Sequence, residues 1–290
     1  MSDTPFEGEV LAPAKINLAL HIVGRREDGY HLLESVAVFA ARIADRLSIE
    51  PAHKDRLVVD GPFAVGVPTD HRNIVHKALD LTREEALRLG LDVPPLLIRL
   101  TKALPHGAGI GGGSSDAAAL LRKLGSLSPD LAAAQARRCT ELGADVPMCM
   151  IAKPVIARGI GEELDEIDLG AMPSMVLVNP QRPISTPTVF KALRNRENAP
   201  LPPLPQGGFW KTGDLIAWLD GTRNDLQETA TAIEPAVGDA VAKLTATGAD
   251  IVRMSGSGST VFALYKDEES AQRGAAALAR TRPDWWVASA

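Results

Sequence analysis

The stretch PHGAGIGGGSSD occupies residues 105–116 of a chain of 290 residues, and five of the seven residues 107–113 are glycines. An apolar pattern with helical spacing follows in residues 117–124. Glycines let backbone N–H groups approach phosphate oxygens, and a helix start presents unpaired N–H donors with about half a positive charge. We therefore expect an anion-binding loop that runs into a helix with Ser114 as its N-cap. A flexible loop before a capped helix is the simpler alternative.

Two familiar phosphate motifs do not describe this loop. Gly107, Gly109 and Gly112 match GxGxxG, but a dinucleotide fingerprint belongs to a βαβ unit with an acidic residue about 20 positions further on. Here the loop begins at residue 105, and its helix leads to a second expected helix. A Walker A loop needs a lysine directly before the serine, and Gly113 occupies that place. The loop therefore belongs to neither class.

Composition narrows the class of protein. The chain has 31 basic and 36 acidic residues and a formal charge of −5, so no global attraction to nucleic acid or anionic lipid is expected. It has no basic and apolar N-terminal leader and no apolar run long enough to span a bilayer, which favours a cytoplasmic protein. Cys139 and Cys149 are too few for a disulfide framework or a four-cysteine metal site.

The pattern of apolar residues predicts alternating strands and helices. Lys15 and Asn17 fall at alternate positions of the first strand and so should point the same way. The length favours about two domains, and we place the boundary near residue 165, giving domains of 1–165 and 166–290. The order of elements predicts an α+β sandwich with helices on one face of a sheet. The expected strands are 10–22, 35–40, 56–59, 96–100, 175–178, 251–254 and 261–265, and the expected helices are 73–89, 114–124, 130–142, 214–219, 235–246 and 268–279.

Three motifs in this order resemble a known superfamily. They are PAKINL at residues 13–18, the glycine loop at 105–115 and SGSG at 255–258. Together they resemble the galactokinase, homoserine kinase, mevalonate kinase and phosphomevalonate kinase (GHMP) superfamily over nearly the whole chain. The resemblance implies a two-domain α+β fold, with an N-terminal nucleotide-binding α/β domain like domain 2 of ribosomal protein S5 and a C-terminal ferredoxin-like sandwich.

Three further motifs resemble one branch of that superfamily. They are DGYH at 28–31, LGADVP at 142–147 and STPTVF at 185–190. Members of this branch phosphorylate the 2-hydroxyl of a cytidine diphosphate derivative of methylerythritol in the non-mevalonate isoprenoid route. The resemblance implies ATP and Mg²⁺ as cofactors, small-molecule substrates, and a monomer or homodimer. Another GHMP kinase, such as a homoserine or mevalonate kinase, is the alternative. A catalytically silent nucleotide-binding regulator is a second one, which the presence of both Lys15 and Asp145 disfavours.

Asp145 is the candidate general base. It stands in the apolar stretch 144–147, where an unpaired carboxylate would be costly to bury, although nearby backbone donors could equally satisfy it. The resemblance assigns this aspartate to catalysis. It also implies that Lys15, on the exposed edge of the first strand, lies beside Asp145, stabilises its ionised form and polarises the acceptor hydroxyl. Asn17 would orient either group by hydrogen bonding.

The glycine loop is expected to hold the ATP phosphates. Ser115 is also the candidate protein ligand of Mg²⁺, with water supplying the remaining ligands. Phosphate contacts are assigned to Pro105, Gly107, Gly109, Ile110, Gly111, Gly112, Gly113, Ser114 and Ser115.

The acceptor site is expected around two aromatic residues in loop-like, polar surroundings, Tyr30 and Phe190. In the resembled enzymes these positions sandwich the cytosine, and His31 would then read the edge of the base. Thr186 and Asp145 would approach the methylerythritol end. The turn at 255–259, with Gly256 and Ser257, is expected to approach the active site and to keep substrate and loop in register. Core packing for Phe190 and a plain hairpin turn at 255–259 are the simpler alternatives.

Overall fold

The computed structural model describes residues 6–205, 208–209 and 211–290, which form two compact units. Two long strands, β1 (Gly8–Arg25) and β2 (His31–Pro51), each contribute to both units. Each unit is assembled from several segments of the chain, whereas the expected boundary near residue 165 divides the chain at one point. The domains 1–165 and 166–290 therefore stay a prediction. Unit 1 comprises the described residues of Met1–Ala14 with Ile43–Leu104 and Gly111–Ala152, and unit 2 comprises those of Lys15–Arg42, Pro105–Ile110 and Lys153–Ala290.

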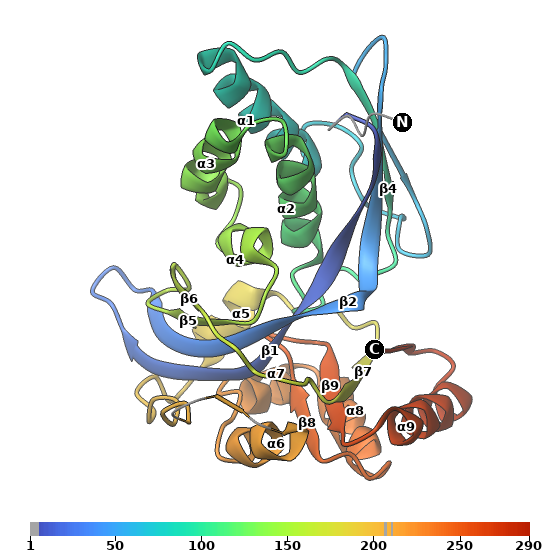
Figure 1. Cartoon of the computed structure of the whole chain (residues 1–290). Coiled ribbons are helices and arrows are strands. Elements are labelled where there is room, and N and C mark those ends of the chain that lie inside the picture. The colour runs from blue at the N-terminus through green and yellow to red at the C-terminus, as the bar shows by residue number, and fades with distance from the viewer. Residues whose placement is uncertain (1–5, 206–207, 210) are drawn as a thin grey trace. The chain divides into compact units, whose positions relative to one another are not determined.

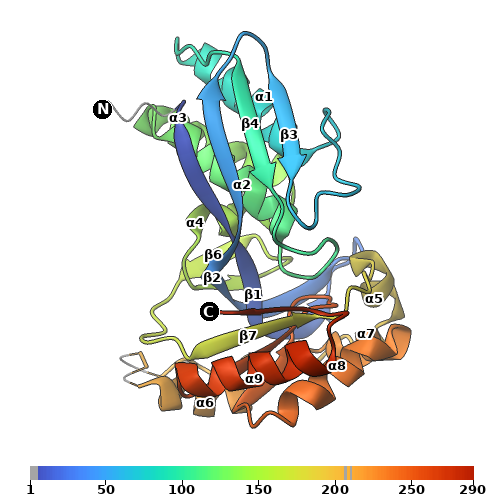
Figure 2. The same cartoon turned by 90° about the vertical axis from the view of Figure 1, so that its right-hand side faces the viewer.

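Unit 1 is a layer of strands covered by helices. The C-terminal half of β2 pairs antiparallel with β4 (Leu96–Thr101), which pairs parallel with β3 (Arg56–Asp60). Both views place the helices of this unit on one side of these strands (Figures 1 and 2). The helices are α1 (Ile74–Arg88), α2 (Gly112–Gly125), α3 (Pro129–Arg138), the 3-10 turn η1 (Cys139–Glu141) and α4 (Val146–Ile151).

Local sequence signals account for the ends of α1 but not for the start of α2. The Asn73 side chain accepts a hydrogen bond from Val75 N and caps α1, close to the predicted start. The prediction that Ser114 caps α2 is wrong. The N-cap is Gly111, in the left-handed conformation at φ +65°, and the helix begins at Gly112. Glycine adopts this conformation without a steric penalty, so the helix starts inside the glycine run.

Unit 2 contains the C-terminal part of β1, the N-terminal part of β2 and a second sheet. β2 pairs antiparallel with β5 (Val155–Arg158), and β5 pairs with β6 (Glu163–Glu166). Among the described residues the second sheet runs in the order β10 (Trp286–Ser289), β7 (Ser174–Asn179), β9 (Val261–Tyr265) and β8 (Ile251–Met254), all antiparallel.

Helices cover one face of this second sheet, which confirms the predicted α+β sandwich. Both α8 and α9 pack directly on its strands (Figure 2). The longest helix in the described part of the chain, α1, has 15 residues, and no described helix could cross a membrane. The helices of unit 2 are α5 (Thr186–Ala192), α6 (Thr212–Asp220), α7 (Gln227–Ile233), α8 (Pro235–Thr245) and α9 (Glu268–Thr281).

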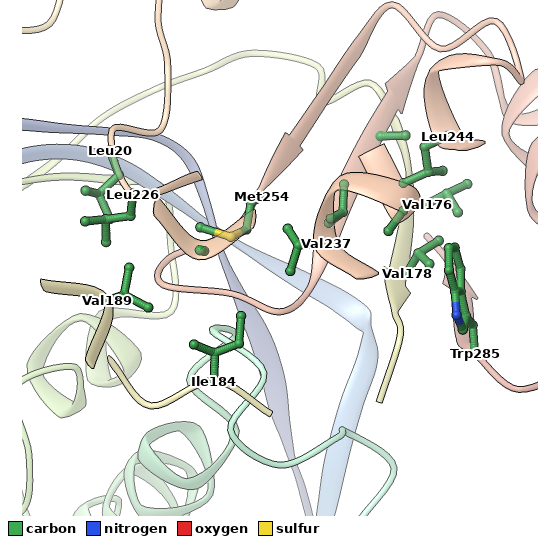
Figure 3. Close-up of a cluster of buried hydrophobic side chains, with 14 of the residues drawn as sticks. Leu20, Val176, Val178, Ile184, Val189, Leu226, Val237, Leu244, Met254 and Trp285 are labelled. Atoms are coloured by element: carbon green, nitrogen blue, oxygen red, sulfur yellow. The ribbon is translucent and has the colours of Figure 1, made fainter. Parts of the chain in front are cut away.

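The apolar core of unit 2 fixes the segments that carry the site. Met254 and Val261 are fully buried and flank the turn at 255–259. Val189 of α5 belongs to the same buried cluster, together with Leu20 of β1 (Figure 3). Burial of such side chains stabilises each by about 1.5–3 kcal/mol. The core therefore holds the ends of the turn and the inner face of α5 in fixed positions.

Candidate active site

The first half of the glycine loop, Pro105–Ile110, packs against the turn at 255–259 within unit 2. Ser255 Oγ donates to the carbonyl oxygen of Gly109 at 3.1 Å, and Thr260 N donates to that of Ala108 at 3.0 Å. Gly109 has φ +71°, and a Cβ there would lie 2.5 Å from Ser255 O. At Gly256, with φ +55°, a Cβ would lie 2.8 Å from Gly109 O. Loop and turn thus meet backbone to backbone, which requires glycine on both sides.

The first strand joins the same assembly through Lys15 and Asn17. Lys15 N donates to Ile110 O at 2.9 Å, and Asn17 N donates to Ser255 Oγ at 3.1 Å. The two side chains point the same way, as the strand pattern predicts, because Lys15 Nζ donates to Asn17 Oδ1 at 3.0 Å. Asn17 Nδ2 in turn donates to Ser35 Oγ at 2.7 Å. Asn17 is therefore oriented from both sides and holds the Lys15 ammonium in place.

The expectation that Lys15 lies on an exposed strand edge is wrong. The exposed fraction of Lys15 is 5%, and every residue of β1 from Ala12 to Ile22 is buried as well. A buried ammonium loses its hydration and depends on hydrogen bonds and nearby negative charge to remain favourable. The environment of Lys15 is therefore that of a functional or structural lysine, unlike that of a solvated surface charge.

Two asparagines that belong to no motif brace the turn at 255–259. Asn224 Nδ2 donates to the carbonyl oxygens of Met254 at 2.7 Å and of Gly256 at 2.8 Å. Asn179 Nδ2 donates to Thr260 Oγ1 at 2.9 Å. Both side chains are buried, so these bonds are shielded from competing water. Sequence reasoning missed both residues, since each is an isolated asparagine far along the chain from the turn.

The structure brings Thr186 and Ser257 together, two residues assigned to the acceptor. Their hydroxyl oxygens lie 2.6 Å apart. Thr186 is the first residue of α5 and is exposed, whereas Ser257 is buried in the turn. This hydrogen bond connects the start of α5 to the turn.

The second half of the glycine loop forms the N-terminus of α2 in unit 1. The N–H groups of a first helical turn have no acceptor within the helix. Those of residues 112–114 are therefore donors of the kind that bind an anion. Ser115 behaves differently from its neighbour, because it is fully buried and its Oγ donates to Pro13 O at 2.8 Å. Ser114 is half-buried. Ser115 therefore ties α2 to β1, and Ser114 is the more accessible hydroxyl.

A buried cluster of three charged side chains, Asp45, Lys102 and Asp116, lies next to this helix start. Lys102 Nζ donates to Asp116 Oδ2 at 2.7 Å and also donates to Asp45. Asp45 Oδ1 accepts from the backbone N–H groups of Ala103 at 2.6 Å and Leu104 at 2.9 Å. The cluster links β2, the segment that enters the glycine loop and the first turn of α2. It is a second feature that sequence reasoning missed.

The third member of the cluster, Asp116, is incompletely satisfied. Its side chain is almost fully buried, and its Oδ1 has no hydrogen-bond partner among the described residues. Desolvation raises the pKa of Asp116 to about 8, against the attraction of Lys102 and with the repulsion of Asp45. One lysine faces two carboxylates, so a proton on Asp116 makes the cluster neutral.

Asp145 lies near the helix start that presents Ser114. It is the N-cap of α4, but its side chain makes no capping bond to that helix. Just before it, a Cβ at Gly143 would lie 3.9 Å from Ser114 Oγ, and α4 packs on α2. The segment 143–145 therefore runs beside the N-terminus of α2, within the same unit.

His31 and Phe190 form an aromatic pair in unit 2. Their ring centroids are 5.2 Å apart with the planes tilted by 37°. Phe190 lies in α5 and packs partly against the core cluster, so the prediction of a loop-like setting is wrong for this residue. The neighbouring Tyr30 is 61% exposed. Stacking of an additional flat ring is chemically suited to such a partly open aromatic site.

The imidazole of His31 has an unused polar atom. Its Nε2 is buried and has no hydrogen-bond partner among the described residues. Desolvation lowers the pKa of His31, and the positive charges of Arg196 and Arg25 lower it further. The ring is therefore neutral at pH 7 and can offer one hydrogen bond at Nε2. Buried polar atoms without partners are rare in native proteins, and a ligand is one explanation for them.

Known proteins match this chain over nearly its full length. Residues 73–153 match the family model of the GHMP kinases N-terminal domain, and residues 210–284 match that of the GHMP kinases C-terminal region. A crystal structure of homoserine kinase from Cytophaga hutchinsonii shares the fold, with a TM-score of 0.65 at 17% identity over 100% of this chain and 96% of the other. Fold and matched regions thus define a GHMP kinase.

Closer relatives narrow this class. A 4-diphosphocytidyl-2-C-methyl-D-erythritol kinase of Mesorhizobium japonicum is 50% identical over 96% of this chain and 93% of its own length. The enzyme of the same name from Brucella melitensis is 48% identical over 96% and 92%. A crystal structure of 4-(cytidine 5'-diphospho)-2C-methyl-D-erythritol kinase superimposes with a TM-score of 0.77 at 35% identity, covering 97% and 98%. The chain belongs to the family of 4-diphosphocytidyl-2-C-methyl-D-erythritol kinases.

Proposed function

We propose that the chain transfers the γ-phosphoryl group of ATP to the 2-hydroxyl of 4-diphosphocytidyl-2-C-methyl-D-erythritol. The products are the 2-phosphate and ADP, as in the non-mevalonate route to isoprenoid precursors. The substrate oxygen forms a bond to the γ-phosphorus, the bond from that phosphorus to the β,γ-bridging oxygen breaks, and the hydroxyl proton goes to a base. The pair of His31 and Phe190, with an unpartnered Nε2 beside an aromatic face, is the observation that carries the choice of acceptor.

The glycine loop holds the triphosphate in this proposal. Backbone N–H groups at the start of α2 donate to phosphate oxygens, and the helix dipole favours the negative charge. Gly107, Gly109 and Ile110 belong to the part of the loop in unit 2, where Gly109 is fixed against Ser255. Ser114, which is half-buried, adds a hydroxyl donor to the same group of contacts.

Asp145 accepts the proton of the acceptor hydroxyl as the new bond forms. The position of its segment beside Ser114 supports this role, because the base then works next to the phosphate-binding helix start. Lys15 supplies positive charge that favours the ionised carboxylate and polarises the acceptor hydroxyl. Asn17 keeps the ammonium of Lys15 directed through the bond to its Oδ1.

Mg²⁺ would be held together with the nucleotide. Mg²⁺ prefers oxygen ligands, keeps several waters and is commonly held by substrate phosphates with one or two protein groups. Among the described residues no group of three or more His, Cys, Asp or Glu side chains could hold a metal ion, which fits a metal carried mainly by ATP. Ser115, the expected ligand, is fully buried with its Oγ held against Pro13 O, so the half-buried Ser114 is better placed to contribute an oxygen. When bound, the metal would offset the charge of the β- and γ-phosphates.

The cytosine stacks between Tyr30 and Phe190, and His31 Nε2 makes a hydrogen bond to the edge of the base. Thr186 and Ser257, whose hydroxyls already contact each other, approach the methylerythritol end. Both substrates are small molecules, and we propose that the enzyme works in the cytoplasm as a monomer or homodimer.

The test is an assay of ADP release coupled to NADH oxidation, with three acceptors at equal concentration. Turnover is expected with the cytidine-linked substrate, and turnover with mevalonate or homoserine is expected at background level. Cytidine diphosphate should compete with the acceptor and leave the KM for ATP unchanged. Turnover with mevalonate or homoserine, without competition by cytidine diphosphate, would establish the alternative GHMP kinase instead.

A further inference from the structure

We propose that Arg25 and Arg196 bind the diphosphate of the cytidine nucleotide and make the acceptor site selective for a nucleoside diphosphate over the bare nucleoside. This inference rests on the proposed function and adds a diphosphate subsite beside the base site.

The hairpin between β1 and β2 places Arg25 opposite His31. Arg26 N donates to Tyr30 O at 2.8 Å, and a Cβ at Gly24 would lie 3.4 Å from a methyl group of Leu32. Both contacts fit one antiparallel register, in which residues 24 and 32, and therefore 25 and 31, face each other. Side chains directly opposite on such a pair have Cβ atoms about 4.5–5.5 Å apart. Arg25 is thus a direct neighbour of the imidazole.

The segment after α5 brings Arg196 to the same place. Phe190 of α5 contacts the His31 ring, and three residues later Leu193 is buried in the core of unit 2. Beyond Arg196, both N and Nδ2 of Asn198 donate to Ile22 O at 3.0 Å, which ties this segment to β1 three residues before Arg25. Arg196 therefore lies between an anchor on the aromatic pair and an anchor on β1. The positive charges of both arginines act on the imidazole, in agreement with this placement.

Neither guanidinium is neutralised by a carboxylate in the described part of the chain. Arg25 Nε donates to Gly29 O at 3.0 Å, and Arg196 Nε donates to Leu193 O at 3.3 Å. These bonds to backbone carbonyls fix the stems of the side chains and leave the outer N–H groups of each guanidinium for another acceptor. Glu27 and Asp28 also belong to the hairpin, but Asp28 is paired with Arg26 at 2.8 Å.

A diphosphate is the ligand chemistry that this arrangement fits. Two guanidinium groups on separate segments flank an aromatic pair with an unpartnered ring nitrogen. A ligand that contacts all of these groups must carry a flat base and, next to it, a polyanion. Guanidinium groups bind phosphate oxygens through paired, charge-assisted hydrogen bonds. A cytidine diphosphate carries both groups, and its diphosphate is attached to the same ribose as its base.

The experiment measures the affinities of cytidine and cytidine diphosphate by calorimetry at constant ionic strength. Wild type, Arg25→Gln and Arg196→Gln are compared with Arg26→Gln as the control, which removes the same charge from the same hairpin at a residue already paired with Asp28. Each of the first two changes should weaken cytidine diphosphate binding about 10-fold and leave cytidine binding unchanged. The control should change neither affinity by more than about 2-fold. If Arg196→Gln does not fold, Arg196→Lys replaces it, since it keeps the charge and loses the paired donors.

An unchanged ratio of the two affinities in both arginine variants would overturn the diphosphate subsite, and so would an equal loss in the control. Turnover of the wild-type preparation on the cytidine-linked substrate is measured in parallel. Turnover with an unchanged affinity ratio removes only this inference. Absent turnover together with an arginine-dependent affinity ratio removes the proposed function and leaves a binding site for nucleoside diphosphates.

Discussion

Gly109 and Ser255 are in direct contact although 146 positions separate them, because Ser255 Oγ donates to Gly109 O at 3.1 Å. A Cβ at Gly109 would lie 2.5 Å from the carbonyl oxygen of Ser255. The same hydroxyl of Ser255 also accepts from Asn17 N at 3.1 Å. One serine therefore joins the glycine loop, the closing turn and the first strand.

We predict that Gly109→Ala lowers both stability and turnover. The new methyl group would overlap Ser255 O and Gly258 and would separate the loop from the turn. Overpacking of this kind costs about 1–3 kcal/mol, and the left-handed backbone adds about 1–2 kcal/mol. Gly90→Ala is the matched control, because Gly90 has the same φ of +71° and a Cβ there would have nothing within 4 Å of it. Urea unfolding and ADP release are measured on both variants.

The control should lose only the backbone cost of about 1–2 kcal/mol and keep full turnover. Equal effects of the two substitutions on stability and turnover would show that the contact between loop and turn has no importance of its own.

We predict that Asp116 makes stability depend on pH. Its pKa is raised to about 8 in the folded chain, chiefly by desolvation, from about 3.9 when unfolded. The folded state therefore binds the proton more tightly, so the contribution of Asp116 is fully present below about pH 4 and is lost as the pH rises toward 8. Relative to Asp116→Asn, the free energy of unfolding of wild type should fall between pH 5 and 8, by at most about 1.4 kcal/mol per pH unit. It should then level off.

Urea unfolding of wild type and Asp116→Asn at several pH values between 5 and 9 supplies this difference, in which titrations common to both proteins cancel. Asp45 and Lys102 are the charged groups that face Asp116, and both are retained in the variant. A difference that stays constant over this range would contradict a protonated Asp116.

The sequence predicted most elements because their signals are local. The α1 helix has a capping asparagine at residue 73 and a glycine at residue 90, and the observed helix Ile74–Arg88 lies between them. The alternation of polar and apolar residues in the first strand correctly predicted that the side chains of Lys15 and Asn17 lie on one face of β1. The glycine-rich run correctly indicated a loop leading into a helix, although Gly111 takes the capping position that was expected of Ser114.

The remaining features depend on contacts distant in sequence. Burial of Lys15 follows from packing around the whole strand, which alternation alone does not reveal. Phe190 falls in a helix of seven residues, too short to show a helical period. Asp45 and Lys102 are separated by 57 positions and appear as ordinary surface charges until the fold brings them together.

We predict that Tyr30→Ala weakens binding of the cytidine substrate about 10- to 100-fold, because stacking on one base contributes about 1–3 kcal/mol. Tyr30 is 61% exposed, so the melting temperature should not change. Tyr30→Phe keeps the ring and should bind as wild type does. Calorimetry with the cytidine substrate and steady-state kinetics for ATP provide the two readouts. Normal affinity in Tyr30→Ala, or a rise in the KM for ATP alone, would place the base elsewhere.

We predict that Asp145→Asn lowers kcat by about 10²- to 10⁴-fold, the usual range for removal of a general base, and leaves ATP affinity unchanged. The amide is nearly isosteric with the carboxylate but does not accept the proton. Asp130→Asn serves as the control, because Asp130 is an exposed acidic residue in the first turn of α3 in the same unit. ADP release and binding of a fluorescent ATP analogue are measured. Near-normal kcat in Asp145→Asn would exclude it as the base.

Product identification tests the proposed activity most directly. The purified chain is incubated with Mg²⁺, ATP and 4-diphosphocytidyl-2-C-methyl-D-erythritol, and the mixture is followed by phosphorus NMR with proton coupling. We expect one ADP per product molecule and a new phosphomonoester signal without coupling to a carbinol proton, because the 2-carbon carries a methyl group in place of a hydrogen. ADP formation with an unaltered cytidine compound, or a phosphomonoester on a carbon that bears hydrogen, would contradict the proposal.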